Sequence, residues 1–361
     1  METVDAHAIK IDVSPLPYGG VMSYALPFDR SAREALEQIS LSPAATQARG
    51  AGTRVVAEAP DPMRTCFEQD RDRIVHSSAF RRLAGKTQVF IFPADHQRTR
   101  LTHALEVAQV ATSIGRALGL NVALIEAIAL GHDCGHGPGG HASEDALSPY
   151  LAGGFDHAVW GADVALDDLN QCRETLDGIR NHSWSRPPAA TPEGAVVSWA
   201  DRIAYVCHDF EDAISAGVTT ADMLPEPVRD LAGSTRRQQL SSFIAAVIDT
   251  AATSGSIGMS GPMTDALAAF RSFNYEHIYL RPASRNQAQL VTEVVRALVE
   301  LYADRPDALS ERRGSALRAG SDAALHRAVG YVAGMTDRFA VRCAVGQLGW
   351  DASKLQAFSP G

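Results

Sequence analysis

The sequence predicts an all-α protein. Along most of its 361 residues, apolar side chains recur at the three- and four-residue spacing of helices that bury one face. No section shows the strict alternation of apolar and polar residues that predicts strands. One apolar stripe ends in adjacent histidine and aspartate before a glycine-rich turn, which places nitrogen and oxygen ligands at the floor of a cavity. We find no internal repeat, heptad pattern or low-complexity tail.

The composition narrows the class of protein. Hydrophobic residues make up 45% and charged residues 21%, the balance of a globular protein with a large core. The formal net charge of −9 argues against nucleic acid as the default partner, since domains that bind it are usually basic. Five cysteines without CxxC spacing argue against a disulfide framework and indicate a reducing compartment. With no signal pattern and no uncharged apolar run of roughly 18 residues, we expect a cytoplasmic protein with no membrane segment.

The first 60 residues contain scattered proline, glycine and alanine, with one short amphipathic piece at 31–39, and we expect an N-terminal arm there. A helical apolar rhythm begins at residue 64, and residues 88–92 predict a short extended segment. Basic side chains are concentrated in this stretch: Arg71, Arg73, Arg81, Arg82 and Lys86. In an acidic protein such a cluster favours an anion site, because guanidinium groups suit bidentate phosphate contacts.

Two helices with a short turn between them follow, at residues 99–118 and 122–132. In the first, His103 lies on the apolar stripe that continues through Val107, Val110 and Ile114. A histidine in such a place is often part of the core. The second helix ends at His132, so the short connection brings the two histidines towards each other.

The stretch from Gly131 to Glu144 concentrates the polar chemistry of the chain. It reads Gly-His-Asp-Cys-Gly-His-Gly-Pro-Gly-Gly-His-Ala-Ser-Glu and includes His132, Asp133 and His136. Its glycines allow a sharp turn and a close approach of the backbone to a ligand. A dinucleotide loop is excluded because a helix precedes these glycines, where that motif requires a strand.

A helix at 142–150 places His141 at its N-terminal edge and Glu144 one turn later, so this imidazole and carboxylate can pair. Further helices are expected at 156–169, which begins near His157, and at 174–182.

The helix at 195–215 carries Asp201, Tyr205 and Asp209 on one face at i, i+4 and i+8, with Arg202 beside them. An aspartate in the middle of an apolar helix needs a partner, because burying an unpaired carboxylate is costly. We expect fewer catalytic or binding residues in the remaining helices, which the periodicity places at 237–252, 262–277, 285–302 and 323–342.

The combination of His103, His132, Asp133 and Asp201 predicts a mixed nitrogen and oxygen site for a divalent metal. Such ligands suit Mn²⁺, Mg²⁺ or Fe²⁺, with Zn²⁺ as an alternative, and the residues do not choose among them. A zinc site through Cys134 lacks the usual structural-zinc spacing. The chain has neither a GxxxxGK[ST] sequence nor an HExxH sequence.

This histidine, histidine–aspartate and aspartate pattern resembles the HD-domain metal-dependent phosphohydrolases. Five further segments resemble one bacterial branch, the deoxyguanosinetriphosphate triphosphohydrolase-like proteins; they lie at residues 71–83, 86–90, 98–103, 174–179 and 333–338. The resemblance implies an HD-domain helical bundle with a helical C-terminal extension. The HD catalytic domain would span residues 61–220, and a C-terminal region over 221–361 would complete the pocket and make oligomer contacts.

The resemblance also implies hydrolysis of deoxynucleoside triphosphates, with dGTP the favoured substrate, to a deoxynucleoside and inorganic triphosphate. Members form tetramers or hexamers, and some bind a regulatory nucleotide or single-stranded DNA. Mapped onto this chain, the metal ligands are His103, His132, Asp133 and Asp201, and the catalytic residues are His136, His141, Glu144 and His157. The residues that bind substrate are Gln88, Arg100, Arg202, Tyr205 and Asp209.

Two alternatives stay open at this point. One is a different HD phosphohydrolase, such as a nucleotidase that acts on monophosphates, against which the arginine density before His103 argues. The other is a non-catalytic nucleotide sensor or DNA-binding protein. A sensor has no need of a proton donor, so the presence of His136, His141 and Glu144 argues against it.

Overall fold

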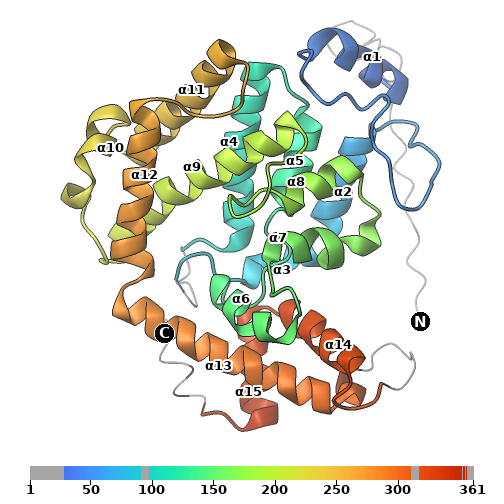
Figure 1. The fold of residues 1–361 in the computed structure, drawn as a ribbon, viewed down its shortest axis with the longest axis vertical. Helices are drawn as coiled ribbons and strands as arrows, with labels where there is room; N and C mark the ends of the chain where they lie inside the picture. Colours follow the sequence, from blue (N-terminus) through green and yellow to red (C-terminus); the bar gives the residue numbers. More distant parts are fainter. Residues whose placement is uncertain (1–27, 91–96, 310–316, 352, 354, 356–361) are drawn as a thin grey trace, which may run out of the picture.

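The computed structural model describes residues 28–90, 97–309, 317–351, 353 and 355. Within these ranges the regular structure is helical and no strand occurs, which confirms the predicted all-α class (Figure 1). The only pairing of extended backbone there is an isolated antiparallel bridge between Thr87 and Thr99. Part of the predicted extended segment, at Ile91 and Phe92, lies outside the described residues. No described helix is long and apolar enough to cross a membrane.

A central bundle is built around α5, whose side chains are almost all apolar and buried. α5 packs against α2, α4, α8 and α9, and α4 also packs along α9. The central helices are α2 (Cys66–His76), α4 (Arg100–Leu118), α5 (Val122–Gly131), α8 (Arg173–Arg180) and α9 (Pro192–Ser215). Short helices border them: α3 (Ser78–Arg82), α6 (His141–Leu147) and α7 (His157–Trp160).

Local signals in the sequence set the ends of these helices. α2 begins with a capping box: the Thr65 hydroxyl accepts from the Glu68 amide, and the Glu68 carboxylate accepts from the Thr65 amide. α4 ends at Gly119, whose φ of 65° is in the left-handed region that favours glycine. Asn121 then caps α5 by accepting a hydrogen bond from the Leu124 amide. The turn that brings α4 and α5 together is therefore fixed locally.

The described part of the predicted arm contacts this chain's own helices. It contains α1 (Arg30–Ser40) and an irregular segment after it. Thr46 donates from both its amide and its hydroxyl to the buried Glu193 carboxylate. Farther along, Arg54 pairs with the buried Asp70 at 2.6 Å. These contacts hold the segment against α2 and α9.

The C-terminal half adds two groups of helices. In one, α10 and α11 pack beside the central bundle together with α12. In the other, α13 lies across the end of the bundle against α6, with α14 and α15 beside it (Figure 1). Their bounds are α10 (Glu226–Leu231), α11 (Arg236–Ser254), α12 (Pro262–Asn274), α13 (Pro282–Asp304), α14 (Asp322–Ala333) and α15 (Asp337–Leu348).

The prediction of one helix over 323–342 is wrong, because α14 and α15 are separate. α14 ends at Ala333, and Thr336 starts α15 by accepting a hydrogen bond from the Phe339 amide. A threonine that caps a new helix satisfies backbone amides that a continuous helix would have paired. The break places Asp337 at the start of α15, where it reaches the glycine-rich loop: its carboxylate accepts from the Gly139 amide at 2.8 Å and from the Thr87 amide at 2.9 Å.

Candidate active site

The four predicted metal ligands meet in one buried place. His103 comes from α4, His132 and Asp133 from the end of α5, and Asp201 from α9. His103 Nε2 lies 3.0 Å from the Asp201 carboxylate, and His132 Nε2 lies 3.4 Å from that of Asp133 and 3.8 Å from that of Asp201. The ligand atoms of His103, His132 and Asp133 all lie within 4.8 Å of one another, close enough to hold one ion.

The ring of His132 is fixed in a way that suits a metal. Its Nδ1 lies 2.7 Å from the carbonyl of Ala129, so Nδ1 carries the proton and donates it there. Nε2 then carries the lone pair, and this atom is buried without a hydrogen-bond partner among the described residues. A carbonyl behind a histidine ligand fixes the tautomer in metal sites. The residues present therefore fit a divalent cation.

Both carboxylates of this set are held in their charged form. Burial alone would raise the pKa of Asp133, but the adjacent Arg100 guanidinium and the His132 ring outweigh it and keep that pKa well below its usual range. At Asp201, the hydrogen bond with His103 and the neighbouring His132 ring outweigh burial and hold the pKa below its usual value. Negative oxygens beside neutral imidazole nitrogens attract a cation.

Arg100 is buried, with 2% of its surface exposed, and donates to Asp133 at 2.7 Å. Its Nε and Nη2 have no partner among the described residues. Gly140 lies against this guanidinium: a Cβ there would come within 2.6 Å of Arg100 Nη2, and the φ of Gly140 is 64°. Buried N–H groups without a partner are costly, so they indicate an anion that the site is built to bind.

Glu144 forms its hydrogen bond with His157 and not with His141, the partner that helical spacing predicts, although ligand atoms of Glu144, His141 and His136 all lie within 4.8 Å of one another. His157 Nδ1 contacts the Glu144 carboxylate in a short hydrogen bond, because α7 brings this ring against the first turn of α6. Burial would lower the pKa of His157, but the Glu144 carboxylate outweighs it and raises that pKa above its ordinary value. His136 stacks on His157 with 3.7 Å between ring centroids, and the exposed His141 lies edge-on to His136 at 5.0 Å.

The remaining predicted residues lie around this cluster. Gln88 is half-buried, and its side-chain oxygen has no partner among the described residues. The Arg202 guanidinium stacks on Trp184, 3.3 Å from the ring centroid, and its Nε is likewise buried without a partner in the described chain. Tyr205 is half-buried and packs against the central core, where burial raises the pKa of its hydroxyl to about 12.

Asp209 is more enclosed than the sequence suggests. It is 3% exposed, and its carboxylate accepts short hydrogen bonds from Arg98 and from the Tyr279 hydroxyl. Burial raises the pKa of Asp209 despite the charge of Arg98. Arg98 also pairs with Glu106 at 2.9 Å and with Asp212 at 2.7 Å. Asp209 thus belongs to a buried ionic network as well as to the face of α9 that carries Asp201.

Known proteins match this chain over most of its length. Residues 100–206 match the HD domain, and residues 257–345 match the phosphohydrolase-associated domain. A deoxyguanosinetriphosphate triphosphohydrolase-like protein of Caldanaerobacter subterraneus is 40% identical over 320 residues, which cover 86% of this chain and 93% of that protein. One of Clostridium perfringens is 39% identical over 322 residues, with 85% and 93% covered. The chain belongs to the deoxyguanosinetriphosphate triphosphohydrolase-like proteins.

Membership of this family confirms the resemblance seen in the sequence. The HD match contains all four predicted metal positions, from His103 to Asp201. Together with the buried histidine–aspartate clusters, it supports a metal-dependent phosphohydrolase. A crystal structure of a hypothetical protein from Aquifex aeolicus shares 17% identity with a TM-score of 0.46, covering 80% of this chain and 71% of that one, a likeness too weak to carry an argument.

In this family member, the structure adds residues to the site that sequence reasoning missed. His182, just beyond α8, is 2% exposed and lies beside His132 and Asp201, and burial lowers the pKa of its ring to about 3. Tyr279, which contacts Asp209, lies just past the predicted helix 262–277. The sequence offers one signal for His182: it ends a predicted helix, as His132 does.

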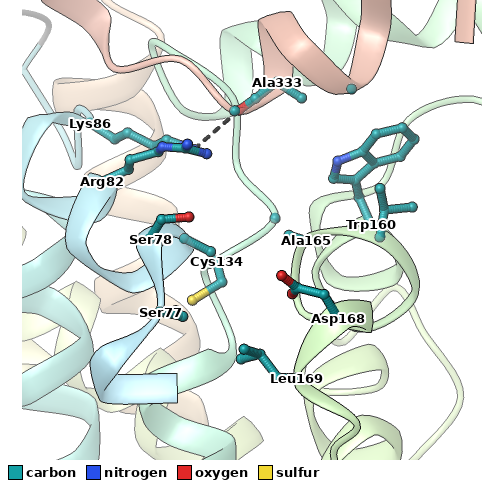
Figure 2. A pocket seen from close by; sticks show the side chains of 15 residues that line it. Ser77, Ser78, Arg82, Lys86, Cys134, Trp160, Ala165, Asp168, Leu169 and Ala333 are labelled. Carbon is teal, nitrogen blue, oxygen red and sulfur yellow. Dashed lines mark hydrogen bonds between the residues drawn. The ribbon is translucent and has the colours of Figure 1, made fainter. Parts of the chain in front are cut away.

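A separate cavity of about 320 Å³ lies beside the same glycine-rich loop. Figure 2 shows Arg82 and Lys86 on one side of it and Trp160 and Asp168 on the other, with Cys134 between them. None of the predicted metal-binding, catalytic or substrate-binding residues lines it, but Arg82 and Lys86 of the predicted basic cluster do. The loop therefore presents Asp133 to the cluster and Cys134 to this cavity, and no potential metal group of the described residues includes that thiol. Burial raises the pKa of Cys134 to about 12, so the thiol stays protonated.

Proposed function

We propose that this protein hydrolyses deoxynucleoside triphosphates, with dGTP the favoured substrate, to the deoxynucleoside and inorganic triphosphate. One observation carries the proposal: a metal-binding set, the unpartnered N–H groups of Arg100 and the Glu144–His157 pair converge in one buried site. A metal set alone would fit many HD phosphohydrolases. Buried guanidinium donors beside it favour a substrate with a chain of phosphates.

The divalent ion, Mn²⁺, Mg²⁺, Fe²⁺ or Zn²⁺, would be held by His103, His132, Asp133 and Asp201 and would act as a Lewis acid on a phosphoryl oxygen. Arg100 and Arg202 would bind the other phosphate oxygens. Two buried nitrogens of Arg100 and one of Arg202 have no partner in the described chain, so phosphate oxygens would satisfy their N–H groups. These contacts would orient the α-phosphorus towards the histidine cluster.

In the reaction, water adds its oxygen to the α-phosphorus while the bond to the nucleoside 5′-oxygen breaks. An alkoxide is a poor leaving group, so it needs a proton from a general acid, an effect of about 10²–10⁴-fold. We assign this role to His141. Surrounding protein atoms and the charge of Arg100 lower the pKa of its ring to about 4, and the negative charge of a bound triphosphate would raise that pKa. Glu144 fixes His157, and the stacked His136 is thereby held between that pair and Asp133, at 3.3 Å from the Asp133 carboxylate.

The first prediction concerns the products. With Mn²⁺, dGTP should yield deoxyguanosine and triphosphate in equal amounts, and in ¹⁸O-labelled water the label should appear in the triphosphate because the α-phosphorus is attacked. The substrates to compare are the four deoxynucleoside triphosphates, the four ribonucleotides and dGMP, alone and in pairs. Diphosphate or orthophosphate as the first product would contradict the proposal. Turnover of dGMP alone would identify a nucleotidase, and tight binding without turnover would identify a sensor.

The second prediction concerns the sugar. Asp209 lies two helical turns from Asp201 on α9, and we expect its carboxylate to accept a hydrogen bond from the 3′-hydroxyl while Tyr205 crowds C2′. Hydrogen bonds to charged groups contribute about 1.5–3 kcal/mol, which is roughly 10- to 100-fold in rate. Asp209→Ala should therefore lower kcat/KM for dGTP by that factor and should lower that for 2′,3′-dideoxy-GTP much less.

The matched control is Asp212→Ala. Asp212 lies on α9, as Asp209 does, and its carboxylate also pairs with Arg98. This variant should leave the ratio of dGTP to dideoxy-GTP rates unchanged. Thermal unfolding of both variants separates a loss of substrate contact from a loss of the ionic network. Equal losses on the two substrates in Asp209→Ala would show that Asp209 does not contact the 3′-hydroxyl.

A further inference from the structure

His182 has the side-chain setting of a ligand. It lies two residues beyond the end of α8 and is 2% exposed. Its Nδ1 lies 2.7 Å from the carbonyl of Ile179, three residues earlier in the chain. A carbonyl only accepts hydrogen bonds, so Nδ1 carries the proton and Nε2 of the neutral ring carries the lone pair.

The setting of His182 repeats that of His132. Both rings follow a helix of the central bundle, and both direct Nδ1 to the carbonyl three residues back, at 2.7 Å in each case. The two rings lie edge to face with 4.9 Å between their centroids. Ligand atoms of His132, His182 and Asp201 lie within 4.8 Å of one another. The lone pair of His182 is therefore presented to the same place as that of His132.

His157 provides the other neighbour of this lone pair. The Nε2 atoms of His157 and His182 lie 3.2 Å apart, so one of them must donate a hydrogen bond to the other. Since the proton of His182 is on Nδ1, His157 is the donor. His182 Nε2 thus lies between the metal set and the ring that Glu144 holds, and it is the atom that joins the two halves of the site.

We infer that His182 is a further nitrogen ligand of the metal centre, in addition to His103, His132, Asp133 and Asp201. The inference rests on the metal dependence within the proposed function, and it adds a donor that neither the spacing of the sequence nor the HD pattern marks. A metal bound there would accept the lone pair of His182 Nε2, which otherwise accepts the hydrogen bond from His157. The centre would then offer three imidazole nitrogens and two carboxylates.

The test is metal binding, measured apart from catalysis. The purified protein is freed of metal and titrated with Co²⁺, and the visible absorption of the bound ion reports its ligands. Loss of a residue that only supports a ligand weakens binding by about 10–100-fold. For His182→Ala and His182→Gln we expect at least such a loss of Co²⁺ affinity together with a changed absorption spectrum.

A matched control is His208→Ala. His208 is also buried and also directs Nδ1 to a backbone carbonyl, that of Ala204 at 2.8 Å, but it lies outside the metal groups. This variant should bind Co²⁺ with the wild-type spectrum and affinity. A measurement that needs no variant is pulsed EPR of the Mn²⁺-loaded wild type, in which we expect couplings to three imidazole nitrogens.

The outcomes separate this inference from the proposed function. Unchanged Co²⁺ spectra and affinities in the His182 variants, or only two coupled nitrogens in the wild type, would overturn the ligand assignment and leave triphosphate release untouched. A His182-dependent Co²⁺ spectrum in a protein that releases no triphosphate would support the ligand and refute the substrate. A wild type that binds neither Co²⁺ nor Mn²⁺ would refute both.

Discussion

His132→Ala should lose both bound metal and phosphohydrolase activity. The variant removes the nitrogen whose lone pair is buried without a partner among the described residues and breaks only one hydrogen bond, to the Ala129 carbonyl. Removal of a residue that only supports a metal ligand lowers metal affinity by about 10–100-fold. For His132→Ala we expect a larger loss of metal affinity than this. Elemental analysis of the purified variant, with triphosphate release measured at several Mn²⁺ concentrations, tests both parts.

His141→Ala is the control for this experiment. It removes an exposed histidine that lies edge-on to His136 and to His157 and is not one of the four proposed metal ligands. It should keep the metal and lose about 10²–10⁴-fold in rate, as expected for a general acid. Full metal content in His132→Ala would contradict the ligand assignment. Asp133→Ala is a less clean test, because it also leaves the buried Arg100 without its carboxylate.

Gly135→Ala should destabilise the protein strongly. A Cβ at this position would lie 2.0 Å from the carbonyl oxygen of His157 and 2.4 Å from the amide nitrogen of Gly161. Both neighbours are backbone atoms and cannot rotate away as a side chain can. Overpacking in a core costs about 1–3 kcal/mol and occasionally more, and we expect the upper end or beyond. Chemical unfolding monitored by circular dichroism measures the loss.

Gly153→Ala is the matched control for that loss. Gly153 has no atom within 4 Å of its added Cβ, and its φ is not positive. The free energy of unfolding of Gly153→Ala should stay within about 0.5 kcal/mol of the wild-type value, as for most exposed positions. Because the loop backbone carries His136 and contacts His157, Gly135→Ala should also weaken metal binding. A wild-type unfolding free energy in Gly135→Ala would show that the loop can move away from α7.

The C-terminal helices contact the glycine-rich loop, which carries residues of the candidate active site. Asp337 accepts from the Gly139 and Thr87 amides, so one carboxylate ties the loop to the segment before α4. Val291 of α13 lies so close to Gly139 that a Cβ there would come within 2.5 Å of it. The loop is thus fixed on one side by α7 and on the other by the phosphohydrolase-associated domain.

The sequence predicted most of the helices and the four residues that we propose as metal ligands. His103 lies on the apolar stripe of α4, and Asp201 on the buried face of α9, so helical periodicity alone aims both inward. Asn121 and Gly119 fix a short turn between α4 and α5, which brings His132 near His103. These features depend on residues that are close together in the sequence, so the local spacing of residues predicts them. The break between α14 and α15 was missed because the cap at Thr336 was not recognised, and the predicted helix at 156–169 is divided into α7, a π-helical segment at Gly161–Ala165 and a 3-10 turn at Asp167–Leu169.

Only the tertiary structure decided how the polar groups are paired. Glu144 could reach His141 by spacing, but folding placed His157, 13 residues along the chain, against it. Asp209 is enclosed by Arg98 from 111 residues away and by Tyr279 from 70 residues away. His182 reaches the metal set because α8 packs on α5 and α9. A buried charge binds whichever partner the packed helices bring within hydrogen-bond distance, and the spacing of residues along one helix carries no information about that distance.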